Sequence, residues 1–192
     1  MRATGRQQFK KFEILINLFV KTFSILGKRG NNFCLRMFRN TNGKIGILLR
    51  YIFLKNVAKN VGKNVSIHPN VFLLNVHNLS LGNNISIHPM CYIDATGGIY
   101  IGNNISIAHS STIISSNHTW DDLTIPIKYN KEKLAPVVLD DDIWIGCGVR
   151  ILAGIKISRR SVLAAGAVLT SNVEEFSLMG GVPARLIKKI GR

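Results

Sequence analysis

An aliphatic residue returns at every sixth position through more than half of this 192-residue chain. Three ten-residue segments also repeat at a spacing of 20 residues: VGKNVSIHPN from Val61, LGNNISIHPM from Leu81 and IGNNISIAHS from Ile101. The rhythm stops after Ile113 and resumes in phase at Leu139. A fixed internal period of this kind is typical of a solenoid, in which each repeat stacks on its neighbours.

The period of six determines the shape of each coil. One aliphatic residue in six, with small or polar residues between, makes short strands separated by corners, and it draws no continuous stripe on a helix. Three such hexads close a triangular coil, and two extra corner residues account for the spacing of 20. Gly after the aliphatic residue and the Asn pairs at 83–84 and 103–104 suit tight corners, because both types tolerate positive φ. The sequence therefore predicts an all-β solenoid with aliphatic columns as its core.

Composition and charge divide the chain into two unequal parts. Hydrophobic residues make up 46% of the chain but aromatic residues only 8%, which favours a β core of Ile, Val and Leu. Residues 1–63 contain 14 Lys and Arg against the single acid Glu13, and so carry +13 of the net charge of +15. The segment KKFEILINLFVKTFSILGKRG, from Lys10, mixes these bases with apolar residues at helical spacing and is predicted to be an amphipathic helix. Packing on the solenoid and contact with a membrane surface are both open for it.

Targeting and cysteine patterns favour the cytoplasm. No run of about 18 apolar residues exists, and no signal peptide is recognisable, so no transmembrane helix is expected. No nucleic-acid-binding motif accompanies the basic charge, so nucleic acid is not an expected partner. Cys34, Cys91 and Cys147 are an odd number without metal-ligand spacing, and unpaired thiols in a reducing compartment are expected.

Two stretches resemble the hexapeptide-repeat acyltransferases. IWIGCGVRILAGIKISRRSVLAAGAVLTSNV…GGVPARLIKKI is similar to the C-terminal signature of that family. SSNH…IPI…PVVLDDDIWIG resembles the branch that includes maltose, galactoside and capsular-polysaccharide O-acetyltransferases. The resemblance covers about residues 61–190 and implies a left-handed parallel β-helix, acetyl-coenzyme A as co-substrate, no metal and a homotrimer. It also implies transfer of an acetyl group to a saccharide hydroxyl, in surface or capsular polysaccharide biosynthesis.

The expected organisation has three parts. Residues 1–58 form a basic helical region, residues 59–176 form the β-helix with an excursion loop at 117–136, and residues 177–192 form a C-terminal segment with a short helix. The location is the cytoplasm, with peripheral contact of residues 1–30 at the inner membrane face as an open alternative.

His118 stands where the rhythm breaks. From Ile113 to Leu139 is 26 residues, one hexad plus about twenty extra, so a loop leaves the rigid scaffold at this place, and such loops commonly carry function. The resemblance implies that His118 is the general base, which takes a proton from the acceptor hydroxyl as that oxygen attacks the thioester. A neutral imidazole with a pKa near 6.5 suits that step. The alternative is an ordinary surface histidine.

Residues around the loop are candidates for the acceptor site. The resemblance implies that Asp94 contacts acceptor hydroxyls, while its sequence context also fits a corner Asx-turn before Thr96 and Gly97. Asn117 and Trp120 are expected to shape the same pocket, with the indole ring against a sugar face.

The remaining histidines have structural explanations. His68 and His88 occupy the same place in successive SIHP segments, so a corner role is expected, although relatives often carry Asn near the acceptor at the position of His88. His77 and His109 are ordinary coil residues. A zinc solenoid of the γ-carbonic-anhydrase type would need a further His five residues after His118, where Leu123 stands.

The resemblance also implies a coenzyme groove. Trp144 matches a residue at the pantetheine end, the backbone N–H of Cys147 matches a group near the acyl carbon, and Ala165 matches a residue whose backbone meets the pantetheine amides. The residues matched to the nucleotide end are Thr170, Arg185 and Lys188. Ser171 departs from the pattern, which usually has Lys at this position, so one contact to a coenzyme phosphate is expected to be lost. Arg159 and Arg160 either replace that contact or are surface charges.

Two other functions remain open on the sequence. One is acetylation of serine, an amino sugar or an antibiotic. The other is an oligomeric scaffold without catalysis, against which His118, Trp144 and the GVPA segment argue.

Overall fold

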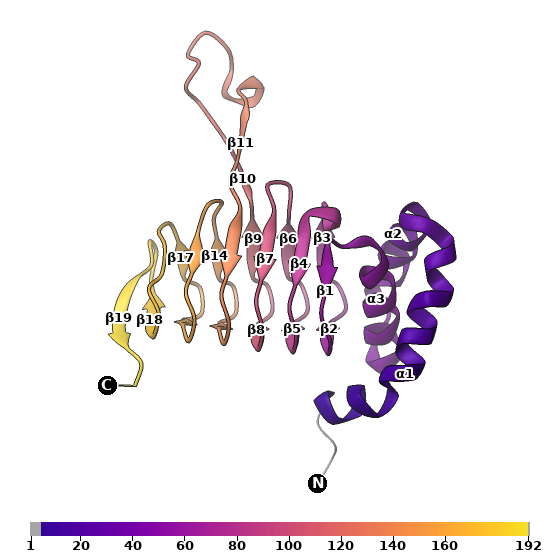
Figure 1. The fold of residues 1–192 in the computed structure, drawn as a ribbon. Coiled ribbons are helices and arrows are strands. Elements are labelled where there is room, and N and C mark those ends of the chain that lie inside the picture. Colours follow the sequence, from indigo (N-terminus) through magenta and orange to yellow (C-terminus); the bar gives the residue numbers. More distant parts are fainter. Residues whose placement is uncertain (1–4, 192) are drawn as a thin grey trace.

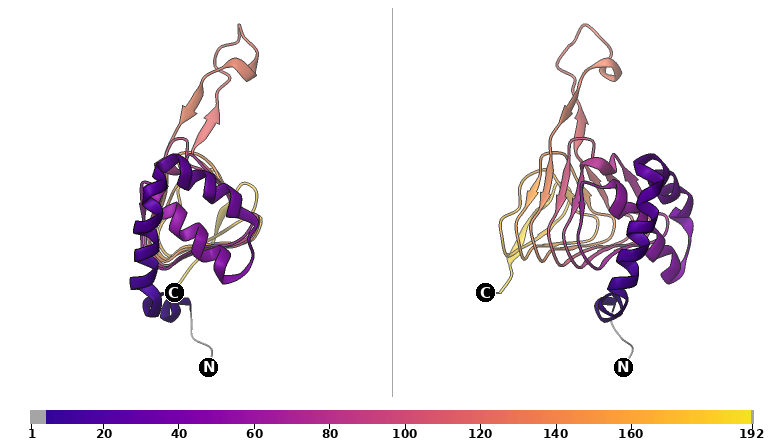
Figure 2. Two further views of the ribbon diagram at one scale, coloured as in Figure 1. Left: turned by 90° about the vertical axis from the view of Figure 1, so that its right-hand side faces the viewer. Right: turned by 45° about the vertical axis from the view of Figure 1, so that its right-hand side comes forward.

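The structure, a computed structural model, describes residues 5–191 as a parallel β-solenoid with helices at its N-terminal end (Figure 1). Seen along the axis, the coils lie one behind another and the helices cover the open end of the first coil (Figure 2). The helical elements are α1 (Gly5–Phe23), η1 (Ser24–Leu26), α2 (Gly27–Met37), η2 (Phe38–Asn40) and α3 (Gly43–Val57). The predicted solenoid with an N-terminal helical region is confirmed.

Strands of successive coils form three sheets. Sheet A runs in the order β1 (Asn60–Val61), β4 (Leu79–Leu81), β7 (Ile99–Ile101), β12 (Val137–Leu139) and β15 (Lys156–Ile157). Sheet B runs in the order β2 (Val65–Ile67), β5 (Ile85–Ile87), β8 (Ile105–Ile107), β13 (Trp144–Ile145), β16 (Val162–Leu163), β18 (Ser177–Gly180) and β19 (Arg185–Lys189). Sheet C runs in the order β3 (Phe72–Leu74), β6 (Tyr92–Asp94), β9 (Thr112–Ile114), β14 (Arg150–Ile151) and β17 (Val168–Leu169). A short helical turn, η3 (Val76–Asn78), follows β3.

The coil shortens at the excursion loop. In the earlier coils, paired residues are 20 apart, as for Ile67 and Ile87. Across the loop Ile101 pairs with Leu139, and from there paired residues are 18 apart, as for Leu139 and Ile157. These side chains are buried, so the six-residue rhythm does build the core columns. The two extra residues of each early coil lie at the corner between sheets C and A, which is also where the loop departs.

Asparagine ladders hold one set of corners. Asn64, Asn84 and Asn104 have φ values of 54° to 57°, in the left-handed region that Asn tolerates. The Asn64 amide donates to the side-chain oxygen of Asn84 (3.1 Å), and the Asn84 amide donates to that of Asn104 (2.9 Å). At the neighbouring Gly82, a Cβ would stand 2.5 Å from the carbonyl oxygen of Gly102, so glycine is required there by close approach.

Helix α3 seals the first coil. Tyr51, Ile52, Phe53, Leu54 and Val57 are buried and continue the aliphatic core of the solenoid. The apolar end of a solenoid must be covered, because it would otherwise leave both the core and a row of backbone groups exposed. Packing of the basic region on the solenoid, one of the two roles left open by the sequence, is therefore present.

The prediction of a short C-terminal helix is wrong. Residues 185–189 form strand β19, which pairs antiparallel with β18 at the edge of sheet B. Segment RLIKK has adequate helix propensity, but pairing satisfies the unpaired backbone groups of the last coil, which a helix would not do.

Arg50 ties the helical region to the first coil. Its guanidinium is buried, and it donates from Nε to the carbonyl oxygen of Ile67 (2.8 Å) and from Nη1 to those of Phe38 (2.8 Å), Arg39 (3.2 Å) and Thr41 (2.7 Å). Burial lowers the pKa of Arg50 from its usual value.

Replacing Arg50 should loosen this end of the molecule. Arg50→Met leaves four carbonyl oxygens without their charged donor, and it should reduce the free energy of unfolding by about 2–4 kcal/mol. Thermal unfolding followed by circular dichroism measures the effect, with the exposed Arg36→Met as matched control. Equal melting temperatures for the two variants would contradict this role of Arg50.

Candidate functional site: two half-sites on opposite edges of one sheet

A β-hairpin leaves the solenoid at the corner between sheets C and A. Its strands are β10 (Ser116–His118) and β11 (Glu132–Leu134), and it projects well beyond the coils (Figures 1 and 2). Ser115 fastens its base: the buried hydroxyl donates to the carbonyl oxygen of Asp94 (2.8 Å) and accepts from the N–H of Gly97 (2.9 Å). The carbonyl of Ser115 accepts from the N–H of Ala135 (3.0 Å), so both hairpin strands start from a fixed point.

His118 ends the first hairpin strand, opposite Glu132. Nε2 of the imidazole lies 3.9 Å from Oε1 of Glu132, too long for a hydrogen bond but close enough for charge interaction. Both side chains are at least half exposed, so the imidazole of His118 is accessible from solvent.

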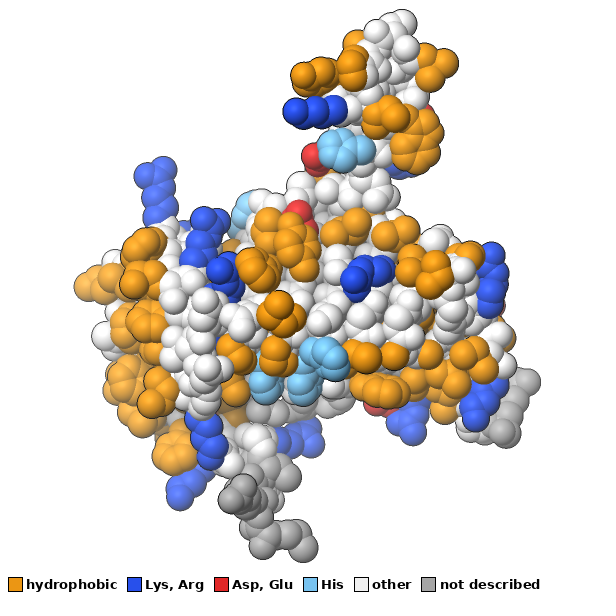
Figure 3. All heavy atoms as spheres, turned by 180° about the vertical axis from the view of Figure 1, so that it is seen from behind, with side chains coloured by type: hydrophobic (Ala, Val, Ile, Leu, Met, Phe, Trp, Pro, Cys, Tyr) orange, Lys and Arg blue, Asp and Glu red, His pale blue; other side chains and the backbone are white. Residues whose placement is uncertain are grey.

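The rest of the loop is ordered by polar contacts but exposes apolar side chains. Asn130 is buried; its amide oxygen accepts from the N–H of Asp122 (2.9 Å) and its Nδ2 donates to the carbonyl of Asp122 (3.2 Å). A short helical turn, η4 (Ile127–Tyr129), precedes it. The exposed large hydrophobic residues of the loop are Trp120, Leu123, Ile125, Ile127, Tyr129 and Leu134. Figure 3 shows hydrophobic side chains on several sides of the protruding loop, with charged side chains and a histidine beside them.

The predicted acceptor residues Asn117 and Trp120 both lie on this hairpin, and both are exposed. Asn117 stands opposite Lys133, one step before His118. The indole of Trp120 is 67% exposed, so in a single chain it forms no wall against another element.

Asp94 lies at the same corner as the hairpin base. Its Oδ1 accepts from the Thr96 N–H (3.1 Å), the Thr96 hydroxyl (2.6 Å) and the Asn75 amide (2.9 Å). These contacts are the corner turn considered for Asp94 from its sequence. All three contacts involve the same carboxylate oxygen, Oδ1.

His88 lies at a different corner, between sheets B and C. Its ring stacks on that of His68, with centroids 4.8 Å apart and planes 8° from parallel. Burial, then the neighbouring His88 and Arg50, lowers the pKa of His68. Within one chain, therefore, His88 is not brought together with Asp94 and His118.

Of the residues predicted for the pantetheine end, Cys147 and Ala165 lie at the same corner as His88, two and three coils further on, whereas Trp144 lies on β13 of sheet B. Trp144 projects from sheet B and is 53% exposed, beside a hollow of about 390 Å³ whose lining includes Ser106, Arg160 and Ile190. Cys147 and Ala165 follow in adjacent coils, and the Cys147 carbonyl accepts from the N–H of Gly166 (2.8 Å). Within residues 5–191, neither the N–H of Cys147 nor that of Ala165 donates a backbone hydrogen bond.

Residues matched to the nucleotide end are more scattered. Thr170 is exposed at the loop-side end of sheet C, in the last coil, whereas Arg185 and Lys188 are exposed on β19. Ser171 is exposed beside Thr170 and offers no positive charge. Arg159 pairs with Glu175 (3.0 Å) and Arg160 with Asp142 (2.6 Å), as surface ion pairs.

The predicted residues thus form two groups at opposite edges of sheet C. One edge holds Asp94, Asn117 and His118, and the other holds Cys147 and Ala165. About five residues of extended chain separate the corners, or about 16 Å. Reacting atoms must approach to about 3–3.5 Å, so the two edges of one chain cannot act on the same bond.

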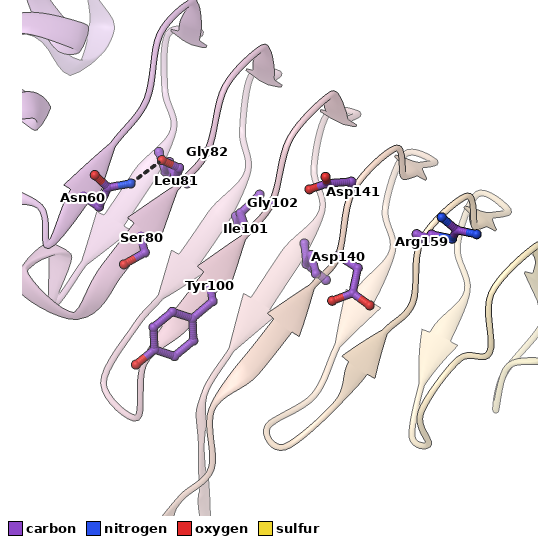
Figure 4. A pocket seen from close by; sticks show the side chains of 11 residues that line it. Asn60, Ser80, Leu81, Gly82, Tyr100, Ile101, Gly102, Asp140, Asp141 and Arg159 are labelled. Carbon is purple, nitrogen blue, oxygen red and sulfur yellow. Dashed lines mark hydrogen bonds between the residues drawn. The ribbon is translucent and has the colours of Figure 1, made fainter.

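One surface hollow lies away from both groups, and Arg159 is the only candidate site residue that lines it. A hollow of about 490 Å³ lies on the outer face of sheet A, where Tyr100 and Asp140 project beside Ser80 (Figure 4). No group of three or more His, Cys, Asp or Glu within residues 5–191 is arranged to hold a metal ion.

Sequence reasoning missed Glu132 and Ser115 as parts of the site. Glu132 faces His118 only because β10 and β11 pair in one register, and nothing local in the sequence sets that register. Ser115 could have been found from the sequence. It is the first polar residue after Ile113 and Ile114, at the place where the aliphatic rhythm stops.

Comparison with known proteins identifies similar proteins as acetyltransferases. No family model matches the chain. A probable acetyltransferase of Mycobacterium tuberculosis is 37% identical over 76 residues, which are 40% of this chain and 25% of that protein. The chain matches only about a quarter to a third of the length of its first curated relatives, which are named as probable or putative acetyltransferases.

Solved structures extend the similarity over most of the chain. A maltose O-acetyltransferase from Clostridium difficile 630 has a TM-score of 0.76 and 27% identity, covering 88% of this chain and 89% of its own. A hexapeptide-repeat-containing acetyltransferase from Vibrio cholerae O1 biovar eltor, complexed with acetyl coenzyme A, has a TM-score of 0.76 at 22% identity and shares the fold, covering 86% of this chain and 87% of its own. The structural neighbours are hexapeptide-repeat acetyltransferases, as the sequence resemblance predicts. This is consistent with an acyl-coenzyme-A-dependent acyltransferase.

Asp94→Asn separates the two roles of this side chain. Asparagine retains the oxygen that accepts from Thr96 and Asn75, so the melting temperature should stay within a few degrees of wild type. Loss of the second carboxylate oxygen should raise the KM for the acceptor by roughly tenfold, the effect of about 1.4 kcal/mol of lost hydrogen bonding to a charged group. Steady-state kinetics with each substrate varied in turn measures this. An unchanged acceptor KM would leave Asp94 with the corner role alone.

Proposed function

We propose that this protein transfers an acetyl group from acetyl-coenzyme A to a hydroxyl of a saccharide, in surface or capsular polysaccharide biosynthesis. The observation that carries the proposal is the fixed, exposed histidine at the only long interruption of the repeat, in a fold whose neighbours include a maltose O-acetyltransferase. Acetyl-coenzyme A is the co-substrate, as in the Vibrio cholerae complex.

The reaction needs both half-sites, and hence two chains. A homotrimer brings the loop edge of one chain against the Cys147 edge of the next, because a closed heterologous interface pairs different surfaces of identical subunits. The exposed apolar side chains of the loop support this arrangement, since they find cover on the neighbouring chain.

In this arrangement His118 acts as the general base. Its imidazole takes the proton of the acceptor hydroxyl while the oxygen attacks the thioester carbonyl carbon. The N–H of Cys147, which donates no backbone hydrogen bond within residues 5–191, donates to the developing oxyanion. The bond to sulfur then breaks, and His118 returns its proton to the leaving thiolate.

Release of free coenzyme A, followed with a thiol reagent, tests the proposed reaction. The panel contains mono- and oligosaccharides, serine, an amino sugar and chloramphenicol. We expect turnover with a saccharide, and product analysis by mass spectrometry should show one added acetyl group on oxygen. Turnover with serine or chloramphenicol alone would favour the other acceptor classes, and none with any acceptor would favour a scaffold.

His118→Ala should abolish most of the catalysis without disturbing the coenzyme edge. Loss of a general base lowers kcat by roughly 10²–10⁴-fold, while the Kd for coenzyme A should change little because its residues lie on the other half-site. The matched control is His77→Ala, an exposed histidine on η3. Wild-type turnover in a well-folded His118→Ala protein would remove His118 from this role.

A further inference from the structure

The outer surface of the helical cap remains apolar after the cap has sealed the solenoid. We define this cap surface by the exposed side chains of residues 5–58. Its members are Ile14, Leu18, Ile25, Leu26, Phe33, Met37 and Ile45. Phe12, Leu15 and Phe19 are exposed as well, but they line a pocket of about 600 Å³ between α1 and the first coil. Ile14 and Ile25 are 89% and 88% exposed. Hydrophobic side chains gather over this end of the molecule, with Lys and Arg beside them (Figure 3).

Sealing the first coil does not explain these residues. Helix α1 already packs inward through Phe9, Ile16, Val20 and Phe23. Ile14 and Leu18 lie on the opposite side of the same helix, one turn apart, next to Lys10, Lys11 and Lys21 in the helical projection. Isolated exposed apolar residues are ordinary, but seven on the outer side of one end of the molecule indicate a surface that is covered in use.

The positive charge of the N-terminal region indicates which partner covers the cap surface. Residues 1–63 carry 14 Lys and Arg against Glu13 alone, and Glu13 is itself paired with Lys63 at 2.7 Å. Two identical surfaces with this charge repel each other, so a second copy is a poor partner. An anionic lipid bilayer attracts Lys and Arg and also accepts apolar side chains. None of the helices within residues 5–191 is long and apolar enough to span a bilayer, so the contact is peripheral.

We propose that the cap surface docks on the face of an anionic lipid membrane. In the trimer of the proposed function, on which this geometry rests, the solenoid axes are parallel. The three caps then share one end of the assembly, and they meet a flat surface together. Three weak contacts in one assembly give stronger binding than any one alone, because the second and third are intramolecular. The acceptor class that follows is a saccharide held at a membrane.

Vesicle flotation with the full chain tests this proposal. We expect binding to vesicles of phosphatidylcholine with phosphatidylglycerol at low salt, and loss of most binding at high salt or with phosphatidylcholine alone. Lys10→Gln with Lys11→Gln should weaken binding by more than tenfold, because each basic residue near such a surface contributes about 1 kcal/mol. Ile14→Asn with Ile25→Asn should also weaken it, and at these exposures neither change disturbs the core. Lys128→Gln with Lys156→Gln, two bases outside the cap, is the matched control and should bind as wild type.

Three results would overturn the proposal. The first is no binding to anionic vesicles at low salt, and the second is equal weakening by the cap and control variants. The third is concentration-dependent association of whole assemblies in analytical ultracentrifugation that Ile14→Asn abolishes, which would make the surface a contact between copies. Flotation needs no catalysis, so it is read independently of the coenzyme A assay. Cap variants should keep turnover with a soluble acceptor, whereas failure of the proposed function would show as no turnover in any variant.

Discussion

Parallel pairing of each coil with the next is the interaction on which the rest of this structure depends. A strand of two or three residues is far too short to be stable by itself, but here each one lies between neighbours and adds one aliphatic residue to a continuous column. Ile67, Ile87 and Ile107 stack in one such column, and the Asn64, Asn84 and Asn104 amides repeat the same register at a corner. Every later feature is placed by this stacking: the corner from which the hairpin departs, the row of backbone donors, and the open end that the helices cover.

Stacking also divides the chemistry between two edges. Because corner residues of successive coils lie directly above one another, Cys147 and Ala165 form an adjacent pair, and Asp94 lies beside the base of the hairpin. The same regularity keeps these groups on opposite sides of sheet C, and no motion of a short strand can bring them together. The proposed reaction therefore requires an interface between two chains, and the apolar loop is the element proposed to reach across it.

The fold and the location of the histidine could be predicted because both depend on a period. The aliphatic rhythm is local and repeats many times, so its interruption near His118 was visible without any structure. The C-terminal strand was missed because β19 exists only where β18 offers an unpaired edge, which is a long-range condition. Glu132 was missed for a related reason, since its position opposite His118 depends on hairpin register. The sequence could not decide whether Asp94 forms a corner turn or contacts an acceptor. In the structure its contacts with Thr96 and Asn75 form the corner turn and use one carboxylate oxygen.

The number of coils between the cap and the hairpin sets the distance between these two elements along the solenoid axis. In sheet A the hairpin returns to β12, three strand spacings from β1, or about 14 Å along the axis. The cap adds a helix layer of about 10 Å. The hairpin that carries His118 thus leaves the solenoid about 25 Å along the axis from the outer surface of the cap. Loss or duplication of one repeat would move the hairpin by one strand spacing, with the core columns unchanged. If the cap docks on a membrane as proposed, the solenoid is a rigid spacer whose length is counted in whole coils, and the number of repeats sets the distance between the membrane and His118.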